Sequence, residues 1–297
     1  DAADSFARSL ALAPLADYVL GDLMHSRMHV CDWAGFDESL ARMKEQVGES
    51  RKVVNPFSVL ALTADLATLR KAAEVFALHQ RSEAFRLGPV SKRARHDRIR
   101  IGYYSADFHE HATAYLMAEL FELHDKNRFE LVAFSFGPET GDPMRQRLSS
   151  AFDRFVDVRL RTDREVALLS REMGIDVAID LKGYTEDSRP GIFACRTAPV
   201  QVSYLGFPGT MGVNFMDYII ADKTLIPTGS QSGYSEKIVY LPNSYQVNDA
   251  KRVISSRAFT REELGLPASG FVFACFNNTY KITPAVFAAW MRILMRV

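Results

Sequence analysis

The sequence predicts an α/β protein in which a parallel sheet follows a helical arm. Apolar residues recur at helical spacing through residues 1–90, and from Ile99 onward strands alternate with helices. Most of these strands are nearly continuous in apolar residues, which is typical of a parallel sheet covered by helices on both faces. The length of 297 residues suits about two domains, at ~150 residues each.

Composition describes an ordinary globular protein and argues against several partners. Hydrophobic residues make up 47% and charged residues 24%, and 36 basic side chains balance 36 acidic ones, so charge gives no argument for nucleic acid or a membrane. No apolar run approaches the ~20 residues that cross a bilayer, and no basic segment followed by an apolar one opens the sequence. Cys31, Cys195 and Cys275 lie far apart, which favours reduced thiols in the cytoplasm. No spacing of residues suggests a metal site.

Residues 1–95 are expected to form the helical arm. Amphipathic helices must bury their apolar stripes against neighbours, and these resemble the end of a solenoid of helical repeats. His25 and His29 lie four residues apart on one helix face, but with no further ligand packing is favoured over a metal site. The three stripes are Leu10, Leu12, Leu15, Tyr18, Val19 and Leu23; Phe36, Leu40, Met43 and Val47; and Leu60, Leu62, Leu66, Leu69, Ala73 and Phe76.

The α/β domain is expected to span residues 96–269. A basic linker leads into it, Gly88–Asp97 with Lys92, Arg93 and Arg95. Helices are predicted after the first strand, at Pro143–Phe152 and at Thr162–Met173, where Thr162 is a candidate N-cap. The predicted strands are Ile99–Tyr104, Glu130–Phe136, Arg154–Val158, Asp176–Leu181, Val200–Leu205, Met216–Ala221 and Ile238–Leu241.

A new unit is expected to begin near Gly270. Phe271–Phe276 is predicted as a strand and Pro284–Val297 as a helix, with Thr283 as its N-cap. One strand and one helix cannot bury a sheet, so residues 270–297 are expected to start a second α/β domain. The remainder of that domain is expected either in a longer chain or in a separate polypeptide.

The turn after the first strand holds a cluster of ionisable groups. Open α/β sheets bind ligands just outside the carboxyl ends of their strands, and Asp107, His109 and His111 occupy that position here. An imidazole there can act as a general base or bind an anionic group. His109 and His111 can equally serve only to cap the helix that follows. The residues alone leave both interpretations open.

Two further stretches could bind an anionic ligand. The loop Gly206–Gly212 contains three glycines and a proline, which lets backbone N–H groups approach a phosphate or a sugar, although a bare turn would look the same. Lys281 lies near a helix start, where an ammonium and backbone N–H groups together favour a nucleotide diphosphate. A surface lysine without a ligand is the alternative there.

Taken together, these stretches resemble the catalytic region of the O-GlcNAc transferases, glycosyltransferases preceded by tetratricopeptide repeats. The resemblance runs in order from about residue 30 to the end of the sequence. It rests on Cys31-Asp32-Trp33, Phe36-Asp37-Glu38, Arg100-Ile101-Gly102-Tyr103, Ser105-Ala106-Asp107-Phe108, His111, Lys182-Gly183-Tyr184-Thr185, Arg196, Ala198-Pro199-Val200-Gln201, Leu205-Gly206-Phe207-Pro208-Gly209-Thr210, Met216-Asp217-Tyr218-Ile219, Tyr234-Ser235-Glu236-Lys237, Phe276-Asn277, Tyr280-Lys281, Pro284 and the helix from Trp290 to Val297.

The resemblance implies a GT-B arrangement, in which two Rossmann-like domains face each other across a cleft. It implies an inverting transfer of N-acetylglucosamine from UDP-GlcNAc, the donor substrate, to Ser or Thr hydroxyls of proteins. Neither a catalytic metal nor another cofactor is implied. The domain boundaries expected on this basis are 1–95 for the arm, 96–269 for the first catalytic domain and 270–297 for the start of the second, nucleotide-binding domain.

The resemblance also implies roles for particular residues. His111 matches the proposed general base, Asp107 a second candidate for proton handling, and Lys281 the group that neutralises the diphosphate leaving group. Since His111 and Lys281 belong to different domains, closure of the domains is expected to assemble the site. The residues implied to border the donor are Thr113, Leu205, Gly206, Pro208 and Asn278.

The partners expected from the resemblance are a UDP-sugar, protein or peptide acceptors and the missing part of the second domain. Without that part, the isolated chain is expected to be inactive. Neither nucleic acid nor a membrane is expected, and a homodimer through the arm is allowed. Two alternative functions are kept: a related GDP-fucose protein O-fucosyltransferase or N-glycosyltransferase, and a helical-repeat scaffold that only recognises proteins.

Overall fold

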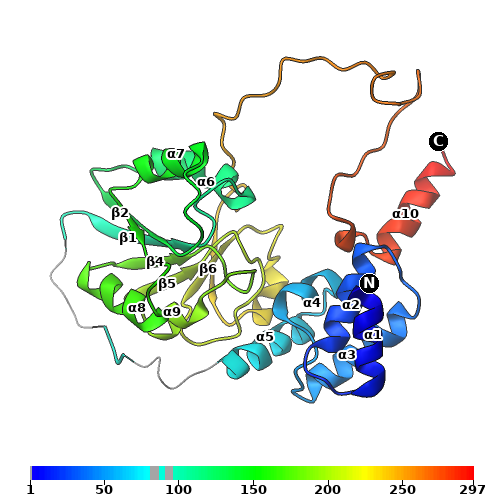
Figure 1. Ribbon diagram of the computed structural model, residues 1–297, viewed down its shortest axis with the longest axis horizontal. Coiled ribbons are helices and arrows are strands. Elements are labelled where there is room, and N and C mark those ends of the chain that lie inside the picture. Colours follow the sequence, from blue (N-terminus) through cyan, green and yellow to red (C-terminus); the bar gives the residue numbers. More distant parts are fainter. Residues whose placement is uncertain (1, 81–86, 91–95) are drawn as a thin grey trace.

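A 7-stranded parallel sheet forms the centre of the computed structural model, which describes residues 2–80, 87–90 and 96–297 (Figure 1). The strand order is β3-β2-β1-β4-β5-β6-β7. All the strands predicted for the α/β domain are confirmed, to within two residues at either end. They are β1 (Ile99–Ser105), β2 (Phe129–Ser135), β3 (Arg154–Asp157), β4 (Val177–Asp180), β5 (Val200–Ser203), β6 (Tyr218–Ala221) and β7 (Lys237–Tyr240).

Strand β1 marks the point where the strand order reverses. It pairs in parallel with β2 on one side and with β4 on the other, so that Ile101 lies beside both Leu131 and Val177. At such a switch point, the loops that leave the two central strands run to opposite faces and open a crevice at the carboxyl edge. The loops after β1 and β4 carry Asp107 and Lys182, and the fold therefore places these two residues at the crevice.

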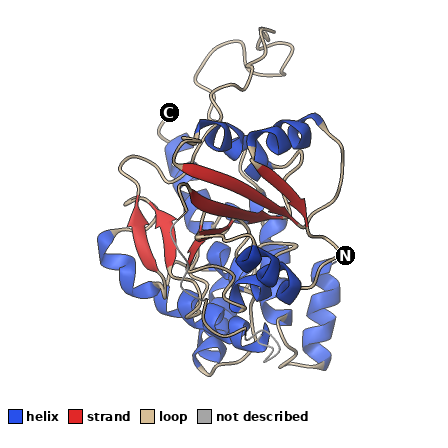
Figure 2. Cartoon of the chain, turned by 90° about the vertical axis from the view of Figure 1, so that its left-hand side faces the viewer, coloured by secondary structure: helices blue, strands red, loops and turns tan. Residues whose placement is uncertain are grey.

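Helices cover both faces of the sheet (Figure 2). On one face, Phe121 of α6 is fully buried with Leu131 of the sheet, and α7 shares this cluster. On the other face, α8 and α9 complete a second cluster, in which the ring of Phe193 lies 5.3 Å from that of Tyr104. The covering helices are α6 (Ala112–Leu123), α7 (Pro143–Ala151), α8 (Asp163–Glu172) and α9 (Pro190–Ala194).

The predicted N-cap of α8 is confirmed. Thr162 Oγ1 accepts a hydrogen bond from the Glu165 N–H at 3.3 Å, and a Glu165 carboxylate oxygen accepts one from the Thr162 N–H at 2.8 Å. This reciprocal pair is a capping box, which satisfies two backbone donors at the start of a helix. The capping rule therefore located this boundary from local sequence.

The arm consists of helices that bury much of the second and third predicted apolar stripes, whereas Leu12 and Leu15 of the first stripe are 89% and 62% exposed. Met28, Met43 and Val47 lie in its core, each at most 1% exposed. The last helix of the arm also packs on the α/β domain, since Ala73 and Ala77 belong to the same cluster as Tyr104. The arm helices are α1 (Ala2–Leu12), α2 (Val19–His29), α3 (Phe36–Gly48), α4 (Pro56–Leu62) and α5 (Leu66–Gln80). Lys92, Arg93 and Arg95 of the predicted linker lie outside the described residues.

After β7 the chain forms a 3-10 turn and a helix but no strand. The strand predicted at Phe271–Phe276 is wrong: these residues have no hydrogen-bonded strand beside them, and Phe271 and Phe276 are 82% and 99% exposed. A strand needs a neighbour to pair its backbone groups, and an apolar run alone does not supply one. The elements of this region are η3 (Thr279–Lys281) and α10 (Pro284–Leu294), whose predicted N-cap Thr283 is confirmed at 3.3 Å from the Val286 N–H; a further 3-10 turn, η2 (Thr228–Gly233), lies between β6 and β7.

No helix within the described ranges combines the length and the apolar character needed to cross a membrane.

A buried amide links β5 to the loops beside it. The side chain of Gln201 is fully buried, and its Oε1 accepts a hydrogen bond from the Thr197 N–H at 2.7 Å. Its Nε2 donates to the carbonyls of Phe193 at 3.0 Å and Phe215 at 2.6 Å. One side chain thus supplies hydrogen-bond partners for three backbone groups that lie outside the strands.

We expect Gln201→Leu to destabilise the protein by about 3 kcal/mol, because it leaves buried backbone groups without partners. Urea unfolding followed by circular dichroism measures this. Gln146→Leu is the matched control, since Gln146 is exposed and its side chain donates to the carbonyl of Gly141; it should change stability by less than about 0.5 kcal/mol. Equal losses in the two variants would contradict the role assigned to Gln201.

Candidate active site

The crevice at the switch point contains a buried ion pair. Lys182 Nζ lies 2.9 Å from both Oδ1 and Oδ2 of Asp107, and the two residues are only 5% and 7% exposed. Asp107 follows β1 and Lys182 follows β4, so the pair joins the two loops at the reversal of strand order. The expected position of Asp107 is confirmed, whereas its lysine partner was not predicted.

The turn that carries Asp107 is held by an aromatic anchor. Phe108 is buried, and its ring lies 5.6 Å from the ring of Phe152 beneath it. Arg145 donates a hydrogen bond to the carbonyl of Phe108 at 3.2 Å, and Ser105 Oγ accepts one from the Asp107 N–H at 2.9 Å. These contacts hold the turn in place and thereby fix the direction of the Asp107 side chain.

His111 begins helix α6 and faces the ion pair at the same time. Its Nδ1 accepts a hydrogen bond from the Thr113 N–H at 3.2 Å and lies 3.5 Å from Asp107 Oδ2. Its side chain is 41% exposed, so the other side of the ring is open to a ligand. The structure confirms that His111 caps the helix. It equally places the imidazole beside a carboxylate. The cap needs an unprotonated Nδ1, whereas a base acting through Nε2 needs the ring proton on Nδ1, facing Asp107, so the two roles use different tautomers of His111.

Several groups set the proton affinity of His111. Burial lowers the pKa of its imidazole, the Asp107 carboxylate raises it, and the charges of Lys182 and His109 lower it further, with a net result below the ordinary value of 6.5. His109 lies on the same turn, with its ring 5.9 Å from that of His111. The imidazole of His111 is therefore predominantly uncharged at neutral pH.

The loop after β5 lies against the loop after β4. A Cβ on Gly206 would come within 1.9 Å of the Leu181 carbonyl oxygen, so only glycine fits there. Leu205 has a positive φ of 64°, and the Pro208 carbonyl accepts a hydrogen bond from the Tyr234 hydroxyl at 3.2 Å. This loop is thus close-packed beside the crevice rather than a bare turn between strands.

A buried carboxylate fixes the rest of this loop. Glu236 accepts hydrogen bonds from the Met211 N–H at 2.6 Å and from Thr210 Oγ1 at 2.7 Å. The sequence did not predict this contact, although Glu236 belongs to one of the motifs that carry the resemblance. Glu236 lies 25 residues after Met211 in the sequence. Nothing in the residues next to Glu236 indicates that its side chain contacts this earlier loop.

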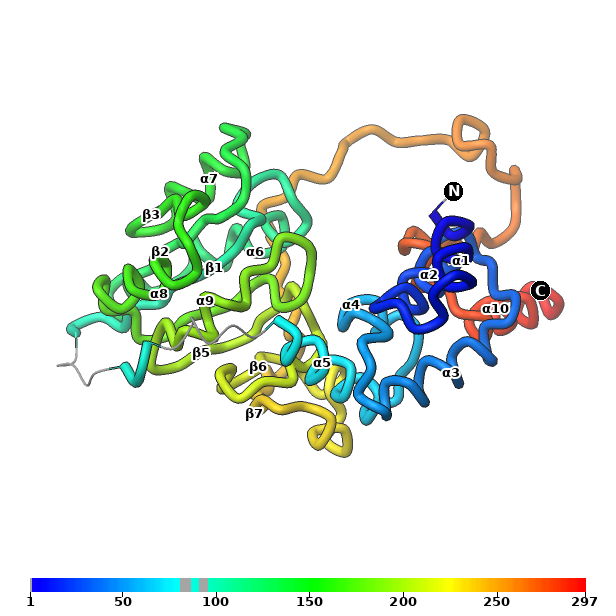
Figure 3. The backbone as a smooth tube through the Cα atoms, turned by 60° about the horizontal axis from the view of Figure 1, so that its bottom comes forward, coloured from blue at the N-terminus to red at the C-terminus, as the bar shows by residue number. Residues whose placement is uncertain are grey.

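Lys281 and Asn278 lie with the arm rather than with the crevice. They flank or belong to η3, which packs against α2, and Lys281 Nζ lies 5.8 Å from the ring centre of Tyr280. Figures 1 and 3 show α10, which follows η3, beside the arm helices and apart from α6. The structure therefore brings Asp107, His111 and Thr113 together and does not bring Lys281 or Asn278 to them.

The two histidines on α2 form a packing site for η3. The ring of Tyr280 lies 5.0 Å from the rings of both His25 and His29, and Thr279 Oγ1 donates to the His29 carbonyl at 2.7 Å. Packing is thus the observed role of this pair. Among the side chains that the structure describes, no group of three or more His, Cys, Asp or Glu residues could hold a metal ion.

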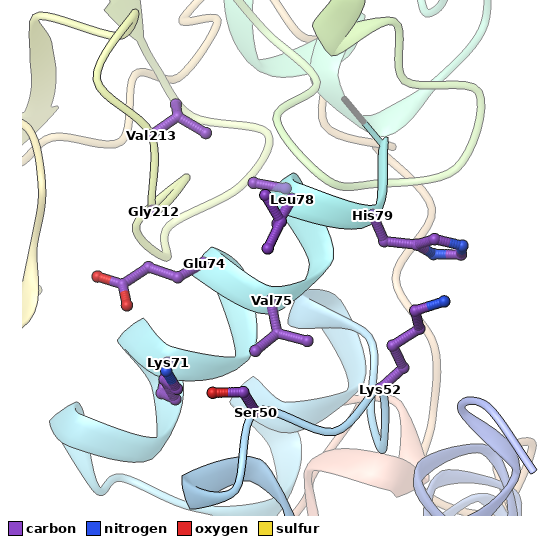
Figure 4. Close-up of a pocket in the computed structure, with 10 residues that line it drawn as sticks. Ser50, Lys52, Lys71, Glu74, Val75, Leu78, His79, Gly212 and Val213 are labelled. Carbon is purple, nitrogen blue, oxygen red and sulfur yellow. The ribbon is translucent and has the colours of Figure 1, made fainter. Parts of the chain in front are cut away.

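A separate cavity of about 540 Å³ lies where the arm meets the catalytic domain (Figure 4). Lys52, His79 and Gly212 are among the residues that line it. Lys52 is paired with Asp17 at 3.1 Å and His79 with the Tyr18 hydroxyl at 3.1 Å, so these groups are engaged within the arm. The crevice at the switch point is therefore the better candidate for chemistry.

An open parallel sheet with polar groups at its switch point defines a Rossmann-like catalytic or binding domain. The match to a family model is specific: the chain belongs to glycosyl transferase family 41, whose model matches residues 30–259. The family resemblance and the GT-B type of α/β fold expected from the sequence are thereby confirmed.

Relatives and a solved structure extend this match. The chain is 33% identical over 295 residues to a probable UDP-N-acetylglucosamine–peptide N-acetylglucosaminyltransferase of Arabidopsis thaliana, covering 93% of this chain and 30% of the relative. A Caenorhabditis elegans enzyme of the same name is 35% identical over 158 residues, covering 53% of this chain and 14% of its own length. A mutant of the Thermobaculum terrenum O-GlcNAc transferase superposes with a TM-score of 0.74 at 26% identity, covering 99% of this chain and 56% of that one.

The cap made by His111 predicts a stability effect that is separable from chemistry. We expect His111→Ala to destabilise the protein by about 1 kcal/mol, because the Thr113 N–H loses its acceptor, and His111→Asn to restore most of the loss, since asparagine is a strong N-cap. Urea unfolding at pH 7.5 measures both. Equal instability of the two variants would show that the cap contributes little.

The pKa of His111 predicts how stability depends on pH. Its folded-state pKa lies below the ordinary value of 6.5, so the unfolded chain binds a proton more readily and stability is lost as the pH falls from about 6.5 downward. His25 and His124 contribute in the same direction, because burial lowers their pKa values too. Unfolding measured between pH 8 and pH 5 should therefore show a smaller loss in His111→Asn than in the wild type. An identical loss in both would contradict this assignment.

Proposed function

We propose that the full-length protein is an inverting glycosyltransferase that moves N-acetylglucosamine from UDP-GlcNAc to Ser or Thr hydroxyls of proteins. Its membership in glycosyl transferase family 41 carries the proposal. The names of the Arabidopsis and Caenorhabditis relatives and of the Thermobaculum structure support the same donor and the same kind of acceptor. The chain spans 30% of the Arabidopsis relative, so the activity is proposed for the longer protein rather than for these 297 residues.

At the acceptor end, attack on the anomeric carbon needs a base beside the hydroxyl. We assign this role to His111, whose ring is partly exposed at the crevice. In the tautomer that carries the proton on Nδ1, Asp107 Oδ2 at 3.5 Å supports that proton and Nε2 is free to accept another. Thr113, Leu205, Gly206 and Pro208 are proposed to border the sugar of the donor; the contact of Thr113 with His111 and that of Gly206 with the loop after β4 support this for two of them.

At the leaving-group end, negative charge develops on the UDP diphosphate and requires a cation. We assign this role to Lys281, with Asn278 beside the nucleotide. Both lie against the arm here, so the proposal requires the second domain to close toward the first when the donor binds. Residues 270–297 are proposed to belong to that nucleotide-binding domain, whose remaining part would supply most of the uridine pocket.

The proposal includes no metal and no other cofactor, because the two charged ends of the reaction are assigned to His111 and Lys281. Protein or peptide acceptors are proposed to approach along the helical arm, through which a homodimer could also form. The cytoplasm is the proposed compartment, in agreement with three cysteines that form no disulfide in the described residues.

Calorimetry provides the test of the donor. UDP and UDP-GlcNAc should bind the full-length protein, GDP should not, and Lys281→Ala should weaken UDP binding markedly because it removes a cation from the diphosphate. Arg292→Ala, a surface change on the neighbouring helix α10, is the control and should leave UDP binding unchanged. GDP binding in place of UDP would instead indicate the fucosyltransferase alternative, and no nucleotide binding would favour the recognition scaffold.

The proposed base predicts a specific loss of rate. His111→Asn keeps the helix cap but has no titratable nitrogen, so we expect it to lower kcat by roughly 10²–10⁴-fold with UDP binding retained. Transfer of radiolabelled GlcNAc to a Ser-containing protein acceptor measures it. Transfer to an Asn side chain of the acceptor, rather than to Ser or Thr, would move the assignment to the N-glycosyltransferase alternative. A variant that keeps full activity would remove His111 from the chemistry.

A further inference from the structure

Lys182, which forms an ion pair with Asp107, has no role in the transfer reaction as proposed above. The two residues are 75 positions apart, and the ammonium donates to both carboxylate oxygens at 2.9 Å. Their side chains are only 8% and 6% exposed. Each charge would be costly if buried alone, so the contact between them is required once both are in the crevice.

A second carboxyl group lies close to Lys182. The Lys182 backbone N–H donates to Asp180 Oδ1 at 2.9 Å, and burial raises the pKa of Asp180 to about 6 against the lowering effects of nearby N–H groups and of the ammonium. Both hydrogen bonds recorded for Lys182 Nζ nevertheless go to Asp107. The charge of Lys182 is therefore directed at Asp107 first.

Asp107 in turn faces His111, whose Nδ1 has two competing neighbours. The Thr113 N–H at 3.2 Å requires an unprotonated Nδ1, whereas Asp107 Oδ2 at 3.5 Å attracts a protonated one. The titratable groups that act on the ring are Asp107 and His109 on its own turn and Lys182 on the loop after β4. An unmatched carboxylate at this distance would draw a proton onto the imidazole and weaken the cap of α6.

We propose that Lys182 is a positioning residue: by occupying both oxygens of Asp107, its ammonium keeps the His111 imidazole uncharged and in place at the start of α6. Burial and the charge of Lys182 lower the pKa of His111, and Asp107 opposes them, so loss of the ammonium leaves the carboxylate unmatched. The consequence for catalysis rests on the proposed function, because a general base must be uncharged before it accepts a proton.

NMR titration of the histidine ring signals tests this on the 297-residue chain, without nucleotide or acceptor. The His111 signal is assigned from its absence in His111→Gln. Lys182→Met should raise the pKa of His111, and Lys182→Arg, which keeps the charge, should hold it close to the wild-type value. Asp107→Asn should shift the pKa in the opposite direction, because it leaves the ammonium without its carboxylate.

Lys182→Met leaves the buried Asp107 carboxylate without a partner, which can destabilise the fold. A second comparison avoids this destabilisation. The double variant Asp107→Asn/Lys182→Met removes both charges, and its His111 pKa should lie above that of Asp107→Asn alone. Circular dichroism confirms the fold of each variant. The assignment is overturned if the His111 pKa does not change on loss of the ammonium in either background.

In the full-length enzyme, Lys182→Met should move the acidic limb of the kcat/KM profile to higher pH, and Lys182→Arg should restore it. A purely structural role would lower kcat/KM at every pH without moving the limb, and would overturn the proposal. The proposed function and the proposed role of Lys182 can be refuted independently. If Lys182→Met raises the pKa of His111 but the full-length protein transfers no sugar, the proposed function is refuted and the role of Lys182 is supported.

Discussion

The pairing of β1 with both β2 and β4 is the constraint on which the candidate site depends. Because these pairings are parallel, the carboxyl ends of the two central strands lie at one edge of the sheet. Asp107 and Lys182 follow them closely and are almost completely buried, so each becomes the partner of the other. His111 lies on the same turn as Asp107, where it serves as the N-cap of α6. Sheet topology thus determines the electrostatics of the crevice.

The sequence was sufficient for most of the fold and for part of the site. Continuous apolar runs identified the strands, and Thr162 and Thr283 marked helix starts, because these signals act over a few residues. The Asp107–Lys182 contact could not be predicted, since it depends on which strands are neighbours. The strand expected at Phe271–Phe276 is wrong for a related reason: strand formation depends on a partner that local sequence does not describe. The roles of Lys281 and Asn278 stay predictions from the family resemblance.

The helical arm packs directly against the α/β domain. Gly212, with a φ of 62°, lies so close to α5 that a Cβ would come within 2.6 Å of the Glu74 nitrogen, and Phe76 packs edge-on against Tyr184 at 5.0 Å. At its other end the arm holds Tyr280 between the two histidines of α2. The arm therefore contacts the loops of the α/β domain through α5 and the segment that carries Lys281 through α2.

The helix cap made by His111, together with the base role proposed for it, has a consequence for how this protein could diverge. A gene copy released from selection for catalysis would still be selected for folding, and folding requires an acceptor at the start of α6. Asn, Asp, Ser and Thr meet that requirement without a titratable imidazole. Inactive descendants are therefore expected to change this position to a capping residue before the surrounding turn decays, leaving a recognisable signature of a lost activity on an intact scaffold.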